Sequence, residues 1–282
     1  MAAESIQKNT ISGKLVNIDN REGTTKKGDE YIGGNIHIET GSDNVIPISF
    51  FATKNKKDGK PNPVYASLQT VIKEYKSIAT HGREEADMVE VGAARLTENS
   101  FFVRDGAMIR GFQFGAPFFN RKADITPQGE FNVVGEVVKI TEDIVDDVPT
   151  GNLTLTMLIV TYSNTANLVD FAVEGEKAVN YVQTNFSPGM EVKLTGDILV
   201  METFDKKVEA SAFGEDIVEE VRKIERKLLV RSATPPVESK ISEEERQTML
   251  AERESKLQTM KQEFLAKQKG NGKQAGAANF SL

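Results

Sequence analysis

The sequence predicts a mainly β protein in which two small barrels in tandem are followed by a C-terminal helix and a flexible tail. Three observations predict this fold class. Two stretches of alternating apolar and polar residues share one order of elements, and each opens with a strand that carries a glycine. A charged helical pattern follows the second stretch. The 282 residues suffice for two cores of about 100–150 residues each.

The first unit shows period-2 alternation and β-branched residues in five segments, which are therefore predicted to be strands: residues 10–19, 33–40, 45–52, 88–96 and 98–114. A helix is expected at 64–77, because its apolar residues recur at helical spacing. The Asp105-Gly106 pair inside the last segment predicts a hairpin turn.

The second unit repeats the plan, with strands expected at residues 131–140, 153–162, 167–173 and, after a helix at 175–186, two strands and a turn within 188–214. Gly135 takes the place of Gly13 in the first strand. ASAFG at 210–214 matches GFQFG at 111–115 and is expected to close the unit. Residues 215–231 read as a helical continuation.

Three strands, a short helix and two more strands follow the order of the OB-fold, a five-stranded Greek-key barrel. The sequence therefore predicts two tandem OB-fold barrels followed by a C-terminal helix and flexible tail. The expected domains are a first barrel at 1–125, a second, acidic barrel with a trailing helix at 126–231, and a linker, helix and tail at 232–282.

The C-terminal helix is expected at about residues 243–267, where Ser242 and Glu245 form a capping box. Leu250, Leu257 and Phe264 recur every seven residues, a stripe too short for a coiled coil. We expect a helix that docks either on a partner or on the body of the protein. Residues 270–282 are expected to be a flexible tail.

Charge divides the chain into thirds. Residues 1–125 have a net charge of +1, residues 126–220 of −13 and residues 221–282 of +5. The acids of the second unit include Glu142, Asp143, Asp146 and Asp147 in one predicted loop, which would repel a phosphate backbone. We therefore interpret the second unit as a dimerisation module, a protein-docking module or a spacer.

Composition excludes several kinds of site. The chain has no Cys and only two His, which excludes a disulfide scaffold, a thiolate nucleophile, Cys-ligated zinc and a His-rich metal centre. It also lacks a phosphate-cradling Gly/Lys loop and a nucleophile elbow. We expect no catalytic residue, no metal and no cofactor. No membrane-length apolar run or signal-peptide layout is present, which predicts a soluble cytoplasmic protein.

The order and pattern of ISGKLVNIDNREGTTKKGDEY, VIPISFFATKNK, LQTVIKEYKS, MVEVGAARL and FFVRDGAMIRGFQF resemble the single-stranded DNA-binding proteins of bacterial and phage replication. The resemblance covers residues 10–115 and, more weakly, 131–214. The chain departs from the bacterial family because it has no Trp and no acidic C-terminal tip. It looks closer to a divergent, tandem phage-type form, which would act in the host cytoplasm.

Binding a single strand needs cations that track phosphates and exposed aromatic rings on which bases stack. The candidate cations lie on the first strand and two loops: Lys14, Arg21, Lys26, Lys27, Lys54, Lys56, Lys57 and Lys60. Among the aromatics, strand parity turns Phe51 outward, and Tyr31 is a further candidate.

The repeat supplies the orientation of the last hairpin. Aligning it with the second unit places Phe101, Ile109, Gly111 and Gln113 inward. The outward set is then Phe102, Arg104, Arg110 and Phe112, although Gln113 fits an inner face poorly. A shift of one residue in register would reverse the assignment.

The leading hypothesis is a non-enzymatic single-stranded DNA-binding protein of replication or recombination, with little sequence preference and strong salt dependence. Replication or recombination proteins are expected partners through the acidic barrel or the C-terminal helix. Self-association and RNA binding are left open. The alternative is a structural or adaptor protein of a phage assembly that uses its OB-folds for protein contacts, which the net charge of −7 favours.

Overall fold

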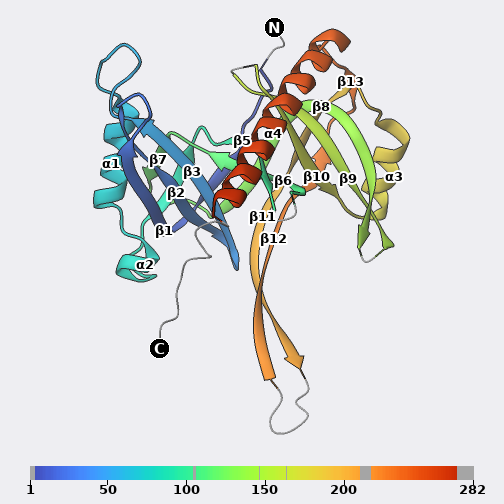
Figure 1. Cartoon of the computed structure of the whole chain (residues 1–282). Coiled ribbons are helices and arrows are strands. Elements are labelled where there is room, and N and C mark those ends of the chain that lie inside the picture. Colours follow the sequence, from blue (N-terminus) through green and yellow to red (C-terminus); the bar gives the residue numbers. More distant parts are fainter. Residues whose placement is uncertain (1–3, 104–105, 146, 163, 210–216, 272–282) are drawn as a thin grey trace, which may run out of the picture.

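The computed structural model describes residues 4–103, 106–145, 147–162, 164–209 and 217–271. These residues form two β-barrels with a long helix, α4 (Glu243–Asn271), lying across them (Figure 1). The predicted fold class of two tandem OB-fold barrels followed by a helix is confirmed. The predicted tail beyond residue 271 lies outside the described residues.

The first barrel comprises β1 (Thr10–Thr24), β2 (Glu30–Gly41), β3 (Asn44–Thr53), α1 (Pro63–Glu74), α2 (Ile78–His81), β4 (Met88–Gly92), β5 (Arg95–Phe102), β6 (Met108–Gly115) and β7 (Phe118–Arg121). Strand β1 pairs with both β2 and β4, while β3 pairs in parallel with β6. Because β5 pairs with β6 and β4 with β7, the fourth and fifth strands of the OB-fold are each broken into two segments.

The second barrel closes in the same order. It comprises β8 (Gln128–Val145), β9 (Val148–Val160), β10 (Ala166–Val173), α3 (Glu176–Asn185), β11 (Met190–Glu209) and β12 (Ile217–Ala233), and β13 (Val237–Glu238) pairs with β11. Strand β8 pairs with β9 and β11, and β10 pairs in parallel with β12. Each barrel thus carries its helix between strands three and four.

The glycine of each first strand lies where a neighbouring backbone comes too close for a side chain. A Cβ at Gly13 would lie 1.9 Å from the carbonyl oxygen of Glu39, and one at Gly135 would lie 2.8 Å from that of Leu158. Each strand then bulges two residues later, at 15–17 and 137–139. The bulge bends the strand, which allows it to pair with two neighbours at once.

The helix predicted at 215–231 is wrong. Residues 217–231 instead belong to β12, which pairs with β11 along its whole length as far as Glu209 and Ile217. The resulting hairpin extends away from both barrels (Figure 1). The closing strand of the second barrel is therefore β12, and the predicted closing segment 210–214 lies outside the described residues.

The two barrels are joined by backbone and side chains. Residues 10–12 of β1 pair with residues 128–130 of β8, and the described strands form one continuous 13-stranded sheet. The Asn44 side chain donates to the carbonyl of Ile198 and accepts from the amide of Val200, both at 2.8 Å. Buried residues of both barrels belong to one hydrophobic cluster. This continuity holds the barrels in a defined relative position.

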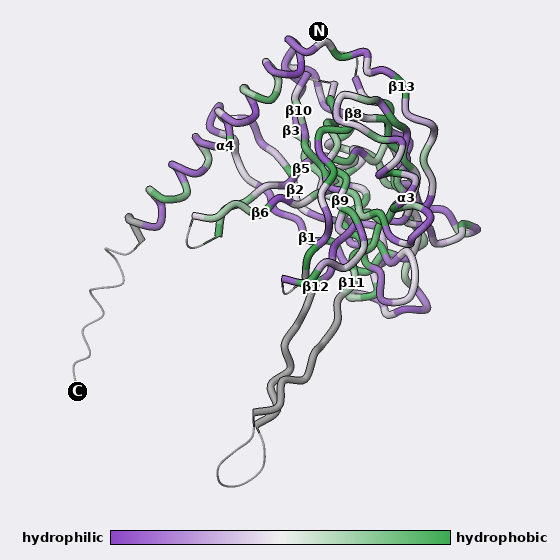
Figure 2. The backbone as a smooth tube through the Cα atoms, turned by 90° about the vertical axis from the view of Figure 1, so that its right-hand side faces the viewer, coloured by the Kyte–Doolittle hydropathy of each residue, from purple (hydrophilic) through white to green (hydrophobic). Residues whose placement is uncertain are grey.

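Helix α4 docks on the body of the protein, which was one of the two expected outcomes. The predicted capping box is present, since Ser242 and Glu245 exchange backbone-to-side-chain hydrogen bonds of 3.3 Å. Figure 2 shows a largely hydrophilic helix with short hydrophobic patches. Within them, Met249 packs in a buried cluster with Leu158 and Leu168 of the second barrel. No helix among the described residues has the length and apolar character needed to cross a membrane.

Candidate nucleic-acid interface

An open groove of about 850 Å³ crosses one face of the first barrel. Three neighbouring strands, β1, β2 and β3, form one side of it, and residues at the ends of β5 and β6 form the other. Polar and apolar residues both line it, and the exposed ring of Phe51 is joined by the polar side chains of Asn20, Arg21, Asn35, Ser49, Arg95, Thr97 and Gln113. A groove of this kind offers hydrogen-bonding groups and one exposed ring to an extended polymer.

Phe51 is the most exposed aromatic side chain of this groove, with 62% of its surface accessible, and its predicted outward orientation is confirmed. The Tyr31 ring lies beside it at a centroid distance of 5.2 Å and a tilt of 31°. Gly33 pairs with Phe51 across the β2–β3 ladder, and a Cβ there would lie 3.1 Å from the ring. The absence of a side chain at residue 33 therefore leaves room for an accessible aromatic platform.

Two arginines accompany the platform. Arg21 is exposed and makes no ion pair with any residue that the structure describes. Arg95, which the sequence analysis missed because nothing indicated the parity of its strand, forms an ion pair with Glu4 of the N-terminal segment. The acid of the groove, Asp19, lies 2.9 Å from Nε2 of His37. Arg21 is thus available to a phosphate without the loss of an existing pair.

The predicted lysines gather mainly at one end of the groove. Lys26 and Lys27 lie in the β1–β2 turn, and Lys56, Lys57 and Lys60 lie in the loop after β3. The two loops are joined through Glu30, which accepts from the backbone amide and from Nζ of Lys54, both at 2.8 Å. The hydrogen bond to Glu30 raises the pKa of Lys54, so this side chain stays protonated but partly neutralised.

Lys14 does not join this group. It lies at the other end of the barrel, where it pairs with Glu39 of β2 on one side and Met88 of β4 on the other. Its Nζ donates to the carbonyl of Arg83 at 2.6 Å. Lys60 is close to Asp58, at 3.4 Å. The cations at the loop end without an ion pair among the described residues are Lys26, Lys27, Lys56 and Lys57.

The predicted orientation of the last hairpin is wrong. Phe101 is exposed on β5, whereas Phe102 is half-buried with its ring 6.2 Å from that of Phe264 in α4. On β6, Gln113 is exposed, while Phe112 is half-buried and packs edge-on against buried Phe114. The alignment set the second strand of this hairpin against residues 208–212, but residues 208–209 lie in β11, and β12, the counterpart of β6, begins at Ile217. Arg104 and Asp105 lie outside the described residues.

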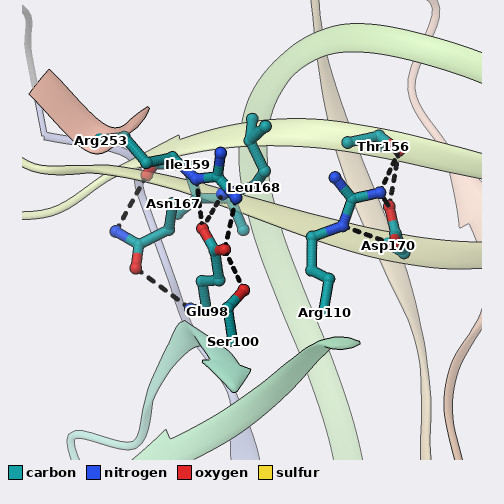
Figure 3. A network of polar contacts seen from close by, with 9 residues as sticks. All are labelled: Glu98, Ser100, Arg110, Thr156, Ile159, Asn167, Leu168, Asp170 and Arg253. Atoms are coloured by element: carbon teal, nitrogen blue, oxygen red, sulfur yellow. Dashed lines mark hydrogen bonds and ion pairs between the residues drawn. The ribbon is translucent and has the colours of Figure 1, made fainter. Parts of the chain in front are cut away.

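Arg110 was predicted to face outward toward DNA, and it is occupied elsewhere. Its guanidinium forms two hydrogen bonds of 2.8 Å to the carboxylate of Asp170 in the second barrel. Thr156 donates to the same carboxylate at 2.6 Å. This bidentate pair, drawn in Figure 3, links the barrels and removes Arg110 from the free cations.

Glu98 of β5 links three parts of the chain (Figure 3). Its carboxylate accepts from Arg253 of α4 at 2.5 and 2.6 Å and from the backbone amide of Leu168 in the second barrel at 3.0 Å. Ser100 donates to it as well. Burial would raise the pKa of Glu98, but hydrogen bonds from Arg253, Ser100 and Leu168 outweigh it and hold the pKa below its usual 4.5. We call this group the Glu98 clamp.

The lowered pKa makes the clamp sensitive to acid. Its contribution to stability is complete above the unfolded-state pKa of a glutamate and is lost as the pH falls through the folded-state pKa. We expect the difference in unfolding free energy between the wild type and Glu98→Gln to shrink from about pH 7 to about pH 3. Urea denaturation across that range measures it, and a constant difference would contradict the assignment.

The acidic hairpin of the second barrel is longer than predicted, because β8 and β9 extend into the expected loop. Glu142 and Asp147 are exposed, Asp143 accepts from the Thr150 hydroxyl at 3.1 Å, and Asp146 lies outside the described residues. Over the part of the chain that the structure describes, no three His, Cys, Asp or Glu side chains are arranged to hold a metal ion.

A protein-family model, YorF, matches residues 6–263 of this chain. The chain belongs to the YorF family. A search of the curated proteins finds no match for this YorF-family chain.

Two solved structures are similar to the YorF-family chain in fold. One is the wild-type single-stranded DNA binding protein from Thermus aquaticus, with a TM-score of 0.48, 9% identity, and coverage of 85% of this chain and 97% of that chain. The other is a deletion mutant of the same protein, with a TM-score of 0.49, 9% identity, and coverage of 85% and 98%.

Proposed function

We propose that this chain is a non-enzymatic single-stranded DNA-binding protein that acts in DNA replication or recombination. The observation that carries the proposal is the exposed Phe51 ring, which lies beside Tyr31 in a groove that also holds Arg21, an exposed cation with no ion pair to any described residue. A base can stack on such a ring while a phosphate meets the guanidinium. The domain at residues 1–125 supplies this contact.

The mechanism is electrostatic capture followed by stacking. Lysines at the end of the groove attract the phosphate backbone and release its counterions, which gives affinity that falls with salt. Stacking on Phe51 requires an unpaired base, and duplex DNA does not present one. The side chains of Asn20, Asn35 and Gln113 suit hydrogen bonds to any base. Preference for single strands with little sequence preference follows.

Fluorescence anisotropy of a labelled dT oligonucleotide, compared with a matched duplex across a salt series, tests the proposal. We expect tighter binding of the single strand and a linear decrease of log affinity with log salt concentration. No binding of the single strand at about 50 mM salt would overturn the proposal, because even non-specific binders are retained there.

The second candidate is an adaptor protein of a larger assembly. The observation that favours it is a group of exposed apolar side chains around the β5–β6 hairpin, namely Phe101, Met108 and Ile109. Apolar residues gathered on a surface commonly mark protein contacts. Failure of the protein to bind the oligonucleotide would favour the adaptor function.

A further inference from the structure

The groove of the first barrel does not end at that barrel. A second hollow of about 320 Å³ shares four lining residues with it, namely Asp19, Asn35, Ser49 and Gln113. Its opposite wall comes from the second barrel, through Val200 of β11 and Arg226 of β12. The first groove therefore opens directly onto the second barrel.

A third hollow, of about 740 Å³, continues between the barrels. It shares Asn99, Phe112 and Arg226 with the second. Exposed apolar side chains line it from both sides, with Phe101 and Ile109 on the first barrel and Ile224 on the second. The three hollows form one track that leads from Phe51 to the space between the barrels.

Most charges along this track are already paired. In the third hollow Arg110 is bound to Asp170, and Lys227 lies 3.1 Å from both Glu174 and Glu225. Arg226 differs from these residues. It is exposed, lines both the second and the third hollow, and makes no ion pair with any residue whose side chain the structure describes. An exposed guanidinium thus lies where the track passes from one barrel to the other.

We propose that a single strand runs along this track, so that the second barrel contacts the phosphate backbone through Arg226 while unstacked bases meet Phe101, Ile109 and Ile224. This inference rests on the proposed function and adds the path of the strand. Asp143 of the acidic β8–β9 hairpin also lines the third hollow, so this part of the track suits neutral bases better than phosphates. The paired charges of the third hollow suit neutral bases, and Arg226 meets the phosphate at its entrance.

The test compares Arg226→Ala with Arg231→Ala. Both arginines are exposed on β12 and both changes remove one positive charge, but Arg231 pairs with Asp197 and lines none of the three hollows. Binding is measured by anisotropy with dT oligonucleotides of about 6 and about 30 nucleotides, since one OB-fold covers about 4–16. Urea denaturation confirms that each variant is folded.

We expect Arg226→Ala to weaken binding of the long oligonucleotide about 5–10-fold at about 0.1 M salt and to reduce the salt slope by about one. Binding of the short oligonucleotide, which the Phe51 groove accommodates, stays unchanged, and Arg231→Ala has the wild-type affinity for both. If the wild type binds but Arg226→Ala binds the long oligonucleotide equally well, the path is wrong and the proposed function stands. If the wild type binds neither oligonucleotide, both the path and the proposed function are wrong.

Discussion

Replacing Arg253 by alanine is expected to lower the free energy of unfolding by about 3–5 kcal/mol. The change leaves the Glu98 carboxylate without its charged partner at a site where the two side chains are only 9% and 11% exposed. A buried charge without a partner lowers the free energy of unfolding far more than the loss of a surface ion pair does. The cost is measured by urea denaturation at neutral pH.

Arg231→Ala is the matched control for this prediction. It also breaks an arginine–carboxylate pair, with Asp197, but Arg231 is largely exposed, so the expected cost is about 0–1 kcal/mol. A double variant, Glu98→Leu with Arg253→Met, removes both charges and should recover part of the stability. Equal costs for Arg253→Ala and Arg231→Ala would show that the Glu98 clamp does not stabilise the fold.

Replacing Phe51 by alanine is expected to weaken single-strand binding roughly tenfold to hundredfold, since stacking contributes about 1–3 kcal/mol per base. The Phe51 ring is exposed, so its loss should hardly change the unfolding free energy. Anisotropy with a dT oligonucleotide measures the affinity. Phe51→Trp, which keeps a ring on the platform, should retain binding.

The matched control for Phe51 is Phe118→Ala. Phe118 belongs to the same barrel and is 43% exposed, but it does not line the groove. Wild-type affinity in Phe118→Ala alongside a loss in Phe51→Ala would assign stacking to the groove. Similar affinities in the two variants would remove Phe51 from the binding surface.

Several elements were predictable because their causes are local. Asn62 and Pro63 start α1, and its buried Leu68 and Val71 lie at helical spacing. The capping box at Ser242 starts α4 for an equally local reason. The exposure of Phe51 followed from alternation along β3, whose neighbours Phe50 and Ala52 are buried. In each case residues within one turn or one strand decide the outcome.

The error at β12 has a physical cause. Its charged residues are good helix formers, and Ile217, Val221, Ile224 and Leu228 recur at a spacing that also suits a helix. What selects the strand is its long ladder with β11 and its parallel contact with β10, which closes the barrel. Pairing with residues that are distant in sequence thus overrides local propensity.

The candidate site shows the same division. The Lys-rich loops and Phe51 were identified from patterns within short segments. The roles of Arg95, Arg110 and Arg226 were not identified, because each depends on which residue of another segment lies nearby. Arg95 pairs with Glu4 and Arg110 with Asp170, whereas Arg226 has no ion-pair partner among the side chains that the structure describes.

Alternation, glycine placement and capping were sufficient to establish two tandem OB-fold barrels followed by a helix. Tertiary pairing decided which face of β5 and β6 is exposed, since a shift of one residue in register turns every side chain to the other face. It also decided that Arg253 of α4 meets Glu98, 155 residues earlier in the chain. Contacts of this kind depend on how distant strands and helices pack, and no short stretch of sequence contains that information.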